Sequence, residues 1–347
     1  MDIKHILVPI RTLRGARATL RKAAALARSS GADIEIFHAI DEPVLVDPER
    51  REPYVIALQR RSASILQKWQ QRLEKLAADP DLAGLQVTAT AAWDYPAHEA
   101  IIRRVNTIHA DLVVASTWHH SAGMRLFLAN TDWELIRHCP CALLLVRSAP
   151  VYQYPKIVAA VDPFQAHAKP ADLDLQILRN ANSVAGLLGG EAHAFHAYKP
   201  VAAISPLAVA QPLAFDFPPE VEEIRAEQMV LALRSLAGKG HIAAEKLHLH
   251  RGEVAIELEM LVHKLRADIV VMGAVSRSGL RRVFIGNTAE RLLDQLTCDV
   301  LVVKPKSFRT SIRGKTPVAA VKRSSARQRP SSWRSGVGHA ALPPPAS

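Results

Sequence analysis

The part of the sequence best suited to binding chemistry is a glycine-bounded loop between Gly273 and Gly286. The loop carries three arginines, Arg277, Arg281 and Arg282. Guanidinium groups can form paired hydrogen bonds with phosphate oxygens, so the cluster suits an anionic ligand. A cluster of charges is also typical of a solvated loop, and both interpretations stay open at this point.

The segments on either side of this loop would place it for anion binding. Ile269–Met272 is apolar without alternation, which predicts a buried parallel strand. Asn287 and Glu290 are spaced for a helix start with a capping box, and a leucine stripe follows. Free N–H groups and the positive end of a helix dipole would then point at the end of the strand. The alternative is that the glycines only make turns.

The histidines offer no convincing metal site. His119 and His120 are adjacent, so they cannot both face one metal from a regular strand or helix. His248 and His250 share a strand face, but two ligands make a poor zinc site. No Ser–His–Asp set or carboxylate pair can be assigned to a pocket from spacing, so we predict no catalytic residue and no metal.

The chain has three cysteines, Cys139, Cys141 and Cys298, and any pairing leaves one unpaired. They form neither a disulfide framework nor a four-ligand zinc pattern, and we expect a reducing cytoplasm as the setting. Cys139 and Cys141 flank a proline and could form a redox pair, although a CxC spacing is a weak signal.

The charge of the chain is concentrated at its end. The chain has 347 residues, 49% of them hydrophobic, and a formal net charge of +11. Eight of the 44 Lys and Arg residues and no acidic residue lie in Arg309–Ser347, so the rest is nearly balanced, with 36 basic and 33 acidic groups. The basic segment is rich in Ser, Pro and Ala, and we expect it to be disordered. No apolar run is long enough to span a membrane, and the start lacks a signal-peptide layout.

The sequence contains the same pattern twice. ADLVVAS at Ala110 matches ADIVVMG at Ala267, FLANT at Phe127 matches FIGNT at Phe284, and CPCALLLVR matches LTCDVLVVK, all at an offset of 157 residues. The first strands, at Ile6 and Ile157, are offset by 151 residues. A period of this length indicates a duplicated domain.

Strand-like and helix-like segments alternate in both copies, which is typical of a parallel, doubly wound α/β sheet. We expect strands at 6–10, 34–40, 85–91, 112–115, 142–146, 157–161, 192–198, 246–250, 269–272 and 300–303. Helices are expected at 16–29, 54–77, 97–108, 172–188, 221–237 and 255–266, with short ones starting near Thr131 and Asn287. The predicted organisation is a first domain at 1–149, a second at 150–306 and a basic tail at 307–347.

Two segments carry a specific resemblance: GAVSRSGLRRVFIGNTAE in the second copy and NTDWELIRHCPC in the first. Together with the repeat, they resemble the universal stress protein family, in its tandem two-domain E-type, over residues 3–306. The resemblance implies a Rossmann-like fold of the adenine nucleotide alpha hydrolase kind, with two domains that are each a five-stranded parallel sheet between helices. It also implies that the last strands, 142–146 and 300–303, pair antiparallel. That pairing would make an intramolecular pseudo-dimer and hide two sheet edges.

The resemblance also implies a ligand site in the second domain. Nucleotide-binding members carry an Asp after the first strand and the motif Gly, two residues, Gly, nine residues, Gly, then Ser or Thr. In this chain Ser276 replaces the second glycine and Asn287 the Ser or Thr, and a Cβ at Ser276 would hinder close approach of the backbone to phosphate. The implied site residues are Asp162, Gly273, Ser276, Arg277, Gly279, Gly286, Asn287 and Thr288. The implied ligand is ATP or another phosphate-bearing molecule.

The first domain departs further from the family pattern. Arg11 stands at the aspartate position, Ser116 and His119 at the first two glycine positions, and Ala129 at the third. By the family pattern this half should not bind ATP in the usual way.

The expected function is a stress-response factor that acts by binding a ligand and an unknown protein partner, and not an enzyme. Homodimer formation is also open. One alternative is a slow ATP hydrolase, for which Asp162 is the one carboxylate we can assign. The other is a nucleic-acid-associated protein that uses the basic segment Arg309–Ser347, although Trp333 is the one aromatic residue for stacking in that segment.

Overall fold

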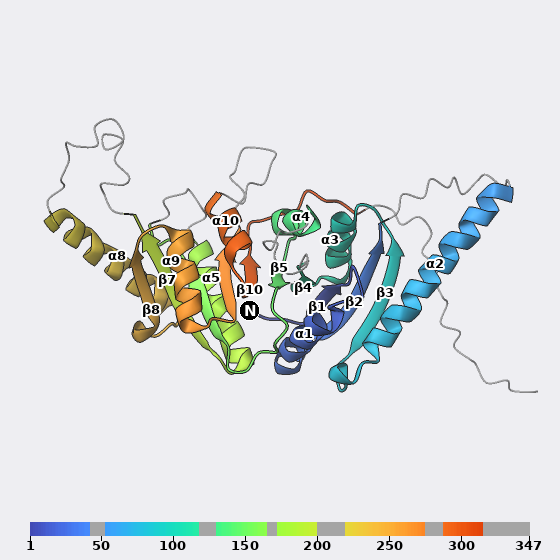
Figure 1. Ribbon diagram of the computed structural model, residues 1–347, viewed down its shortest axis with the longest axis horizontal. Coiled ribbons are helices and arrows are strands. Elements are labelled where there is room, and N and C mark those ends of the chain that lie inside the picture. The colour runs from blue at the N-terminus through green and yellow to red at the C-terminus, as the bar shows by residue number, and fades with distance from the viewer. Residues whose placement is uncertain (42–52, 118–129, 165–171, 200–218, 275–286, 315–347) are drawn as a thin grey trace, which may run out of the picture. The chain divides into compact units, whose positions relative to one another are not determined.

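The computed structural model describes residues 1–41, 53–117, 130–164, 172–199, 219–274 and 287–314. Residues 1–314 form one compact unit (Figure 1). Its first half contains β1 (His5–Pro9), α1 (Ala16–Ser30), β2 (Asp33–Ile40), α2 (Pro53–Ala77), β3 (Val87–Trp93), α3 (Ala97–Ile108), β4 (Leu112–Ser116), α4 (Asn130–His138) and β5 (Ala142–Val146).

The second half repeats the order of strands and helices. It contains β6 (Lys156–Ala160), α5 (Leu173–Leu188), β7 (Glu191–Tyr198), α8 (Pro219–Lys239), β8 (Leu247–Arg251), α9 (Val254–Leu265), β9 (Ile269–Gly273), α10 (Asn287–Gln295) and β10 (Asp299–Val303). Short 3₁₀ turns at Pro80–Leu82 and Ala244–Lys246 precede β3 and β8. The predicted alternation of strands and helices is therefore confirmed, with ends that move by one or two residues.

All ten of these strands belong to one sheet, in the order β3-β2-β1-β4-β5-β10-β9-β6-β7-β8. Strand pairs within each half are parallel, while β5 and β10 pair antiparallel, with Leu144 opposite Leu301. The predicted pairing of the last strands is thus present. It places two strand edges inside the sheet, where their backbone groups are hydrogen-bonded and cannot recruit another chain.

Helices cover both faces of the sheet (Figure 1). One face, the α1/α5 face, is covered by α1, α2, α5 and α8, which bury residues such as Leu20, Leu73 and Leu178 in one apolar cluster. The other, the α3/α9 face, is covered by α3, α4, α9 and α10, which bury residues such as Leu135 and Leu293. The central strands β4, β5, β9 and β10 are buried on both sides, which explains why they are apolar without alternation.

The short segment after β10 lies on the fold. The Phe308 N–H donates to the Pro305 carbonyl at 2.9 Å, and Ile312 packs against the apolar cluster of the α3/α9 face. Of the tail predicted at 307–347, the part from 315 onward lies outside the described residues. No helix in the part of the chain that the structure describes has the length and apolar character to cross a membrane.

Candidate functional site

The predicted ligand site falls at a switch point of the sheet. β6 and β9 are neighbours, with Ala159 beside Val271, and the chain leaves β6 toward β7 on the opposite side. Crevices outside the carboxyl ends of such strands are where open α/β sheets bind ligands. Asp162 follows β6 and Gly273 ends β9, so the fold brings the two positions to the same edge of the sheet.

Asp162 is half-buried at this edge, and its backbone is held in place. Its N–H donates to Asp174 Oδ1 at 3.2 Å, and Asp174 is buried in the first turn of α5. The preceding residue, Val161, donates its N–H to the Phe195 carbonyl at 3.0 Å, and its own carbonyl lies 3.0 Å from His196 Nδ1. Sequence reasoning missed Asp174. An acidic residue in the first turn of a helix is a signal that could have indicated it.

Gly273 has a packing role that the sequence did not reveal. A Cβ at this position would lie 2.8 Å from Leu173 Cδ2 and 3.1 Å from Ile177 Cδ1, both on α5. The missing side chain therefore lets β9 and α5 approach closely. This role explains the glycine without any ligand, so Gly273 by itself is weak evidence for a phosphate site.

The rest of the predicted site is only partly described. Ser276, Arg277, Gly279 and Gly286 lie outside the described residues, as do Arg281 and Arg282. The helix α10 begins at Asn287, as predicted, and Thr288 lies in its first turn, but their side chains are also outside the described part. Their roles stay predictions.

The corresponding edge of the first half holds an ion pair. Arg11 NH1 lies 3.8 Å from Asp132 Oδ1, and the Asp132 carboxylate is buried in the first turn of α4. A carboxylate there interacts favourably with the positive end of the helix dipole, which is where a ligand phosphate would otherwise sit. The Asp132 carboxylate thus supplies the negative charge that a ligand phosphate would bring, and the Arg11 guanidinium balances it. His119 and Ala129 lie outside the described residues.

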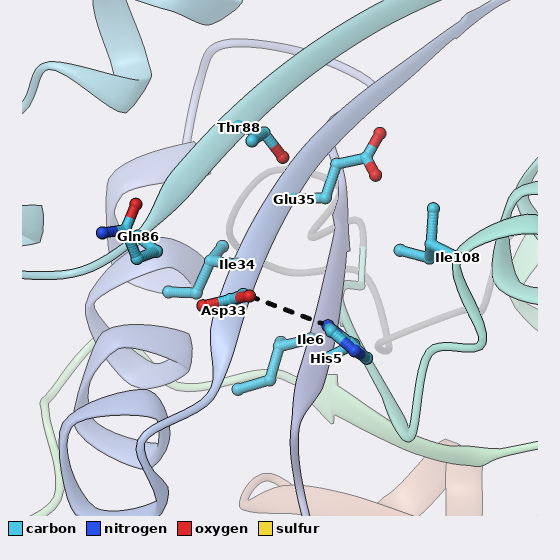
Figure 2. A pocket seen from close by; sticks show the side chains of 8 residues that line it. All are labelled: His5, Ile6, Asp33, Ile34, Glu35, Gln86, Thr88 and Ile108. Carbon is cyan, nitrogen blue, oxygen red and sulfur yellow. Dashed lines mark ion pairs between the residues drawn. The ribbon is translucent and has the colours of Figure 1, made fainter.

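Two hollows among the described residues lie at the other end of the strands. Figure 2 shows the one in the first half, of about 280 Å³, where His5 and Asp33 begin β1 and β2 and Glu35 is a further lining residue. His5 Nδ1 lies 4.0 Å from Asp33 Oδ2, and Arg104 holds Glu35 through two hydrogen bonds of 2.8 and 3.0 Å. Two carboxylates make this hollow unsuited to a phosphate.

The second hollow, also of about 280 Å³, lies at the amino ends of β7 and β8 and is lined by residues that include Gly190, Glu191 and Lys246. No group of three or more His, Cys, Asp or Glu side chains in the described residues is arranged to hold a metal ion.

The sequence pattern of the universal stress protein family matches the chain twice, at residues 2–147 and 153–304. The chain belongs to the universal stress protein family. The two matches correspond to the two halves of the sheet, so the duplication seen in the sequence is a tandem pair of family domains.

Curated relatives align with the chain along nearly their whole length. The chain is 28% identical to universal stress protein E of Photorhabdus laumondii over 322 residues, which cover 90% of this chain and 98% of that protein. It is also 28% identical to universal stress protein E of Escherichia coli K12 over 317 residues, covering 89% and 96% of the two chains.

Among solved structures, a functionally unknown protein, PA1789 from Pseudomonas aeruginosa PAO1, is 26% identical with a TM-score of 0.62, covering 88% of this chain and 93% of its own. A universal stress protein from Archaeoglobus fulgidus has a TM-score of 0.56 at 13% identity and shares the fold.

Proposed function

We propose that this universal stress protein acts by binding a phosphate-bearing ligand, of which ATP is the first candidate, in its second half alone. The observation that carries the proposal is the difference between the two equivalent edges of the sheet. In the first half, Arg11 and Asp132 neutralise each other at 3.8 Å. In the second half, Asp162 replaces Arg11 and Ala289 replaces Asp132 at the start of α10, so that helix end has no carboxylate at the matching position.

The charge pattern fits this ligand. The positive end of α10 and the arginines of the preceding loop suit phosphate groups, while a carboxylate at Asp162 suits hydroxyl or amino donors of a nucleoside. Ligand occupancy would then act on the loop between β9 and α10 and, through it, on a protein partner. In this proposal the protein is not an enzyme.

The test is calorimetric titration of the full-length protein with Mg–ATP, with a matched pair of variants. We expect one site per chain, at least tenfold weaker binding in Asp162→Asn, and unchanged binding in Arg11→Gln, which alters the equivalent position of the first half. Two equal sites, or unchanged binding in Asp162→Asn, would contradict the proposal.

A second measurement covers other phosphate-bearing ligands and hydrolysis. If ATP does not bind, native mass spectrometry of protein purified from cells should show a retained phosphate-bearing molecule, and an empty protein would overturn the proposal. Phosphate release from ATP that depends on Asp162 would favour the hydrolase alternative.

A further inference from the structure

Two thiols meet at the point where α4 ends and β5 begins. Cys139 follows the last residue of α4 and donates its N–H to the Leu135 carbonyl at 2.9 Å, so the helix end fixes its position. The chain bends at Pro140 and Cys141, and the bend brings the Cys141 Sγ to 3.6 Å from the Cys139 Sγ. Cys139 is fully buried, whereas Cys141 is partly exposed.

A cation from the other half of the chain is held at the end of α4, two residues before Cys139. Lys304 follows β10, is buried, and donates from Nζ to the Arg137 carbonyl in the last turn of α4 at 3.1 Å. The hydrogen bond from the Cys141 thiol lowers the pKa of Cys139, and the charge of Lys304 acts in the same direction against the effect of burial. Burial lowers the pKa of Lys304 itself to about 8.

The second half contains the same arrangement with one thiol missing. At the offset of 157 residues, Cys298 corresponds to Cys141, Leu296 to Cys139 and Arg147 to Lys304. Arg147 NH1 donates to the Leu296 carbonyl at 2.6 Å, as Lys304 donates to the end of α4. Burial raises the pKa of the single thiol, Cys298, to about 12. The fold therefore provides an internal control in which the cation is present and the thiol pair is not.

We propose that Cys139 and Cys141 form a peroxide-sensitive dithiol, which Lys304 activates and which closes to a reversible disulfide. In the first step the Cys139 thiolate attacks one oxygen of hydrogen peroxide, the O–O bond breaks, and the departing hydroxide takes up the proton that the thiol had lost, giving a sulfenic acid and water. In the second step the Cys141 sulfur attacks the sulfenic sulfur, and its proton leaves with the hydroxyl group as a second water. Two thiols are oxidised to one disulfide and one peroxide is reduced to two waters.

The chemistry follows from proximity and charge. The thiolate is the reactive form of cysteine. A neighbouring cation lowers the pKa of the thiol, and at a pH below that pKa each unit of lowering increases the thiolate fraction about tenfold. A resolving thiol already at 3.6 Å captures the sulfenic acid before a second peroxide can oxidise it further. Cys298 has no such neighbour in its half, because Leu296 stands where the second thiol would be.

The experiment treats the reduced full-length protein with hydrogen peroxide, blocks the remaining thiols with N-ethylmaleimide and reads each cysteine by peptide mass spectrometry. We expect a loss of two hydrogens in the peptide that contains Cys139 and Cys141, reversed by dithiothreitol, while Cys298 stays reduced over the same time. In Cys141→Ser, dimedone should label Cys139. If the native pair stays reduced while guanidine-unfolded protein forms the disulfide, or if Cys298 oxidises as fast as the pair, the proposal is wrong.

Three variants test the role of the cation. Lys304→Met should slow disulfide formation about tenfold at pH 7 and less at pH 9, where the thiolate forms without help. Lys304→Arg, which keeps a cation, should retain most of the wild-type rate of disulfide formation. Arg147→Met, which removes the equivalent cation of the other half, should leave the wild-type rate unchanged. Equal rates in Lys304→Met and the wild-type protein, or equal slowing in Arg147→Met, would overturn the activation by Lys304.

Discussion

The Lys22 ammonium lies 2.5 Å from Asp299 Oδ2, and both side chains are completely buried although they are 277 residues apart. Lys22 belongs to α1 of the first half and Asp299 to β10 of the second. The carboxylate also accepts the N–H groups of Arg147 and Ser148, at 2.8 and 3.0 Å, and the hydroxyl of Tyr152 at 2.5 Å. The pair therefore joins both halves and the segment between β5 and β6 through one carboxylate.

Asp299→Ala should lower the free energy of unfolding by about 3–5 kcal/mol, because it leaves the Lys22 ammonium buried without its anion. Urea titration followed by circular dichroism gives this quantity. The double variant Lys22→Met with Asp299→Leu should recover only part of the loss. It removes both buried charges, but it leaves the Arg147 and Ser148 N–H groups and the Tyr152 hydroxyl without their acceptor. A loss below about 1 kcal/mol in Asp299→Ala would mean that water or a neighbouring group compensates the ammonium.

The packing around Gly273 has a complementary counterpart in the first half. Gly31 and Gly189 both end their helices in the left-handed conformation, so they are equivalent positions from which the sequences of α1 and α5 can be aligned. Counting back from them, Thr19 stands where α5 has Ile177, and Ser116 stands where β9 has Gly273. In the first half, the larger strand residue Ser116 thus goes with the smaller helix residue Thr19. In the second half, the strand residue is the smaller one, Gly273, and the helix residue is the larger one, Ile177.

Gly273→Ala should therefore destabilise the protein by about 1–3 kcal/mol through overpacking against α5. Leu173→Ala in the same chain should be less costly than it is alone, because the new methyl group occupies part of the space it leaves. Denaturant titration of the two single variants and the double variant measures this coupling. Strictly additive losses would show that the strand and helix shift apart instead.

The repeat explains why so much of the fold was predictable. Two copies of each strand, at an offset of 151 residues for the first strand and 157 for the last two, gave independent signals for the same element. The apolar runs at β4, β5, β9 and β10 indicated strands buried on both faces. The pairing of β5 with β10 came from the family resemblance, and the structure has it.

The interactions between the halves could not be predicted in this way. Lys22 lies in an Ala-rich helix where a lysine normally indicates a solvated face, and nothing local relates it to Asp299. The packing role of Gly273 depends on where α5 lies in space. The matching positions of Arg147 and Lys304 were visible in the repeat, but their crossed bonds to the opposite halves required the antiparallel seam.

His193 and His248 form a partly buried contact that should make stability depend on pH. His193 Nδ1 lies 3.0 Å from His248 Nε2, so one ring must donate and the other accept. Burial lowers the pKa of His248 to about 4, and the charges of His193, His250 and Lys264 act in the same direction. Burial also lowers the pKa of His193, although Glu191 opposes this effect.

The unfolded chain therefore binds more protons than the fold between about pH 6.5 and pH 4, and stability should fall as the pH is lowered through this window. We expect a lower melting temperature at pH 5 than at pH 7. His248→Gln should reduce this dependence, while His263→Gln, which changes an exposed histidine on α9, should not. Equal pH dependence in His248→Gln and the wild-type protein would assign the effect to other groups.

The segment after β10 divides into a part that contacts the fold and a basic remainder. The Lys304 ammonium lies 4.6 Å from the centre of the Phe308 ring, and Ile312 packs on the α3/α9 face. A cation over an aromatic ring contributes about 0.5–2 kcal/mol, and burying an isoleucine contributes a similar amount. These contacts precede residue 315, after which the sequence is rich in Ser, Arg, Pro and Ala.

Two truncations separate these parts. Deleting residues 315–347 should change the melting temperature by no more than about 2 °C, since that sequence contains too little apolar surface to offset the entropy of ordering. Deleting residues 307–347 should lower it by several degrees more, because the Phe308 and Ile312 contacts are lost. Phe308→Ala in the full-length chain should reproduce part of the larger effect. Calorimetric melting of the three proteins decides between these outcomes: a large loss in the shorter deletion would show that the basic tail itself docks on the fold.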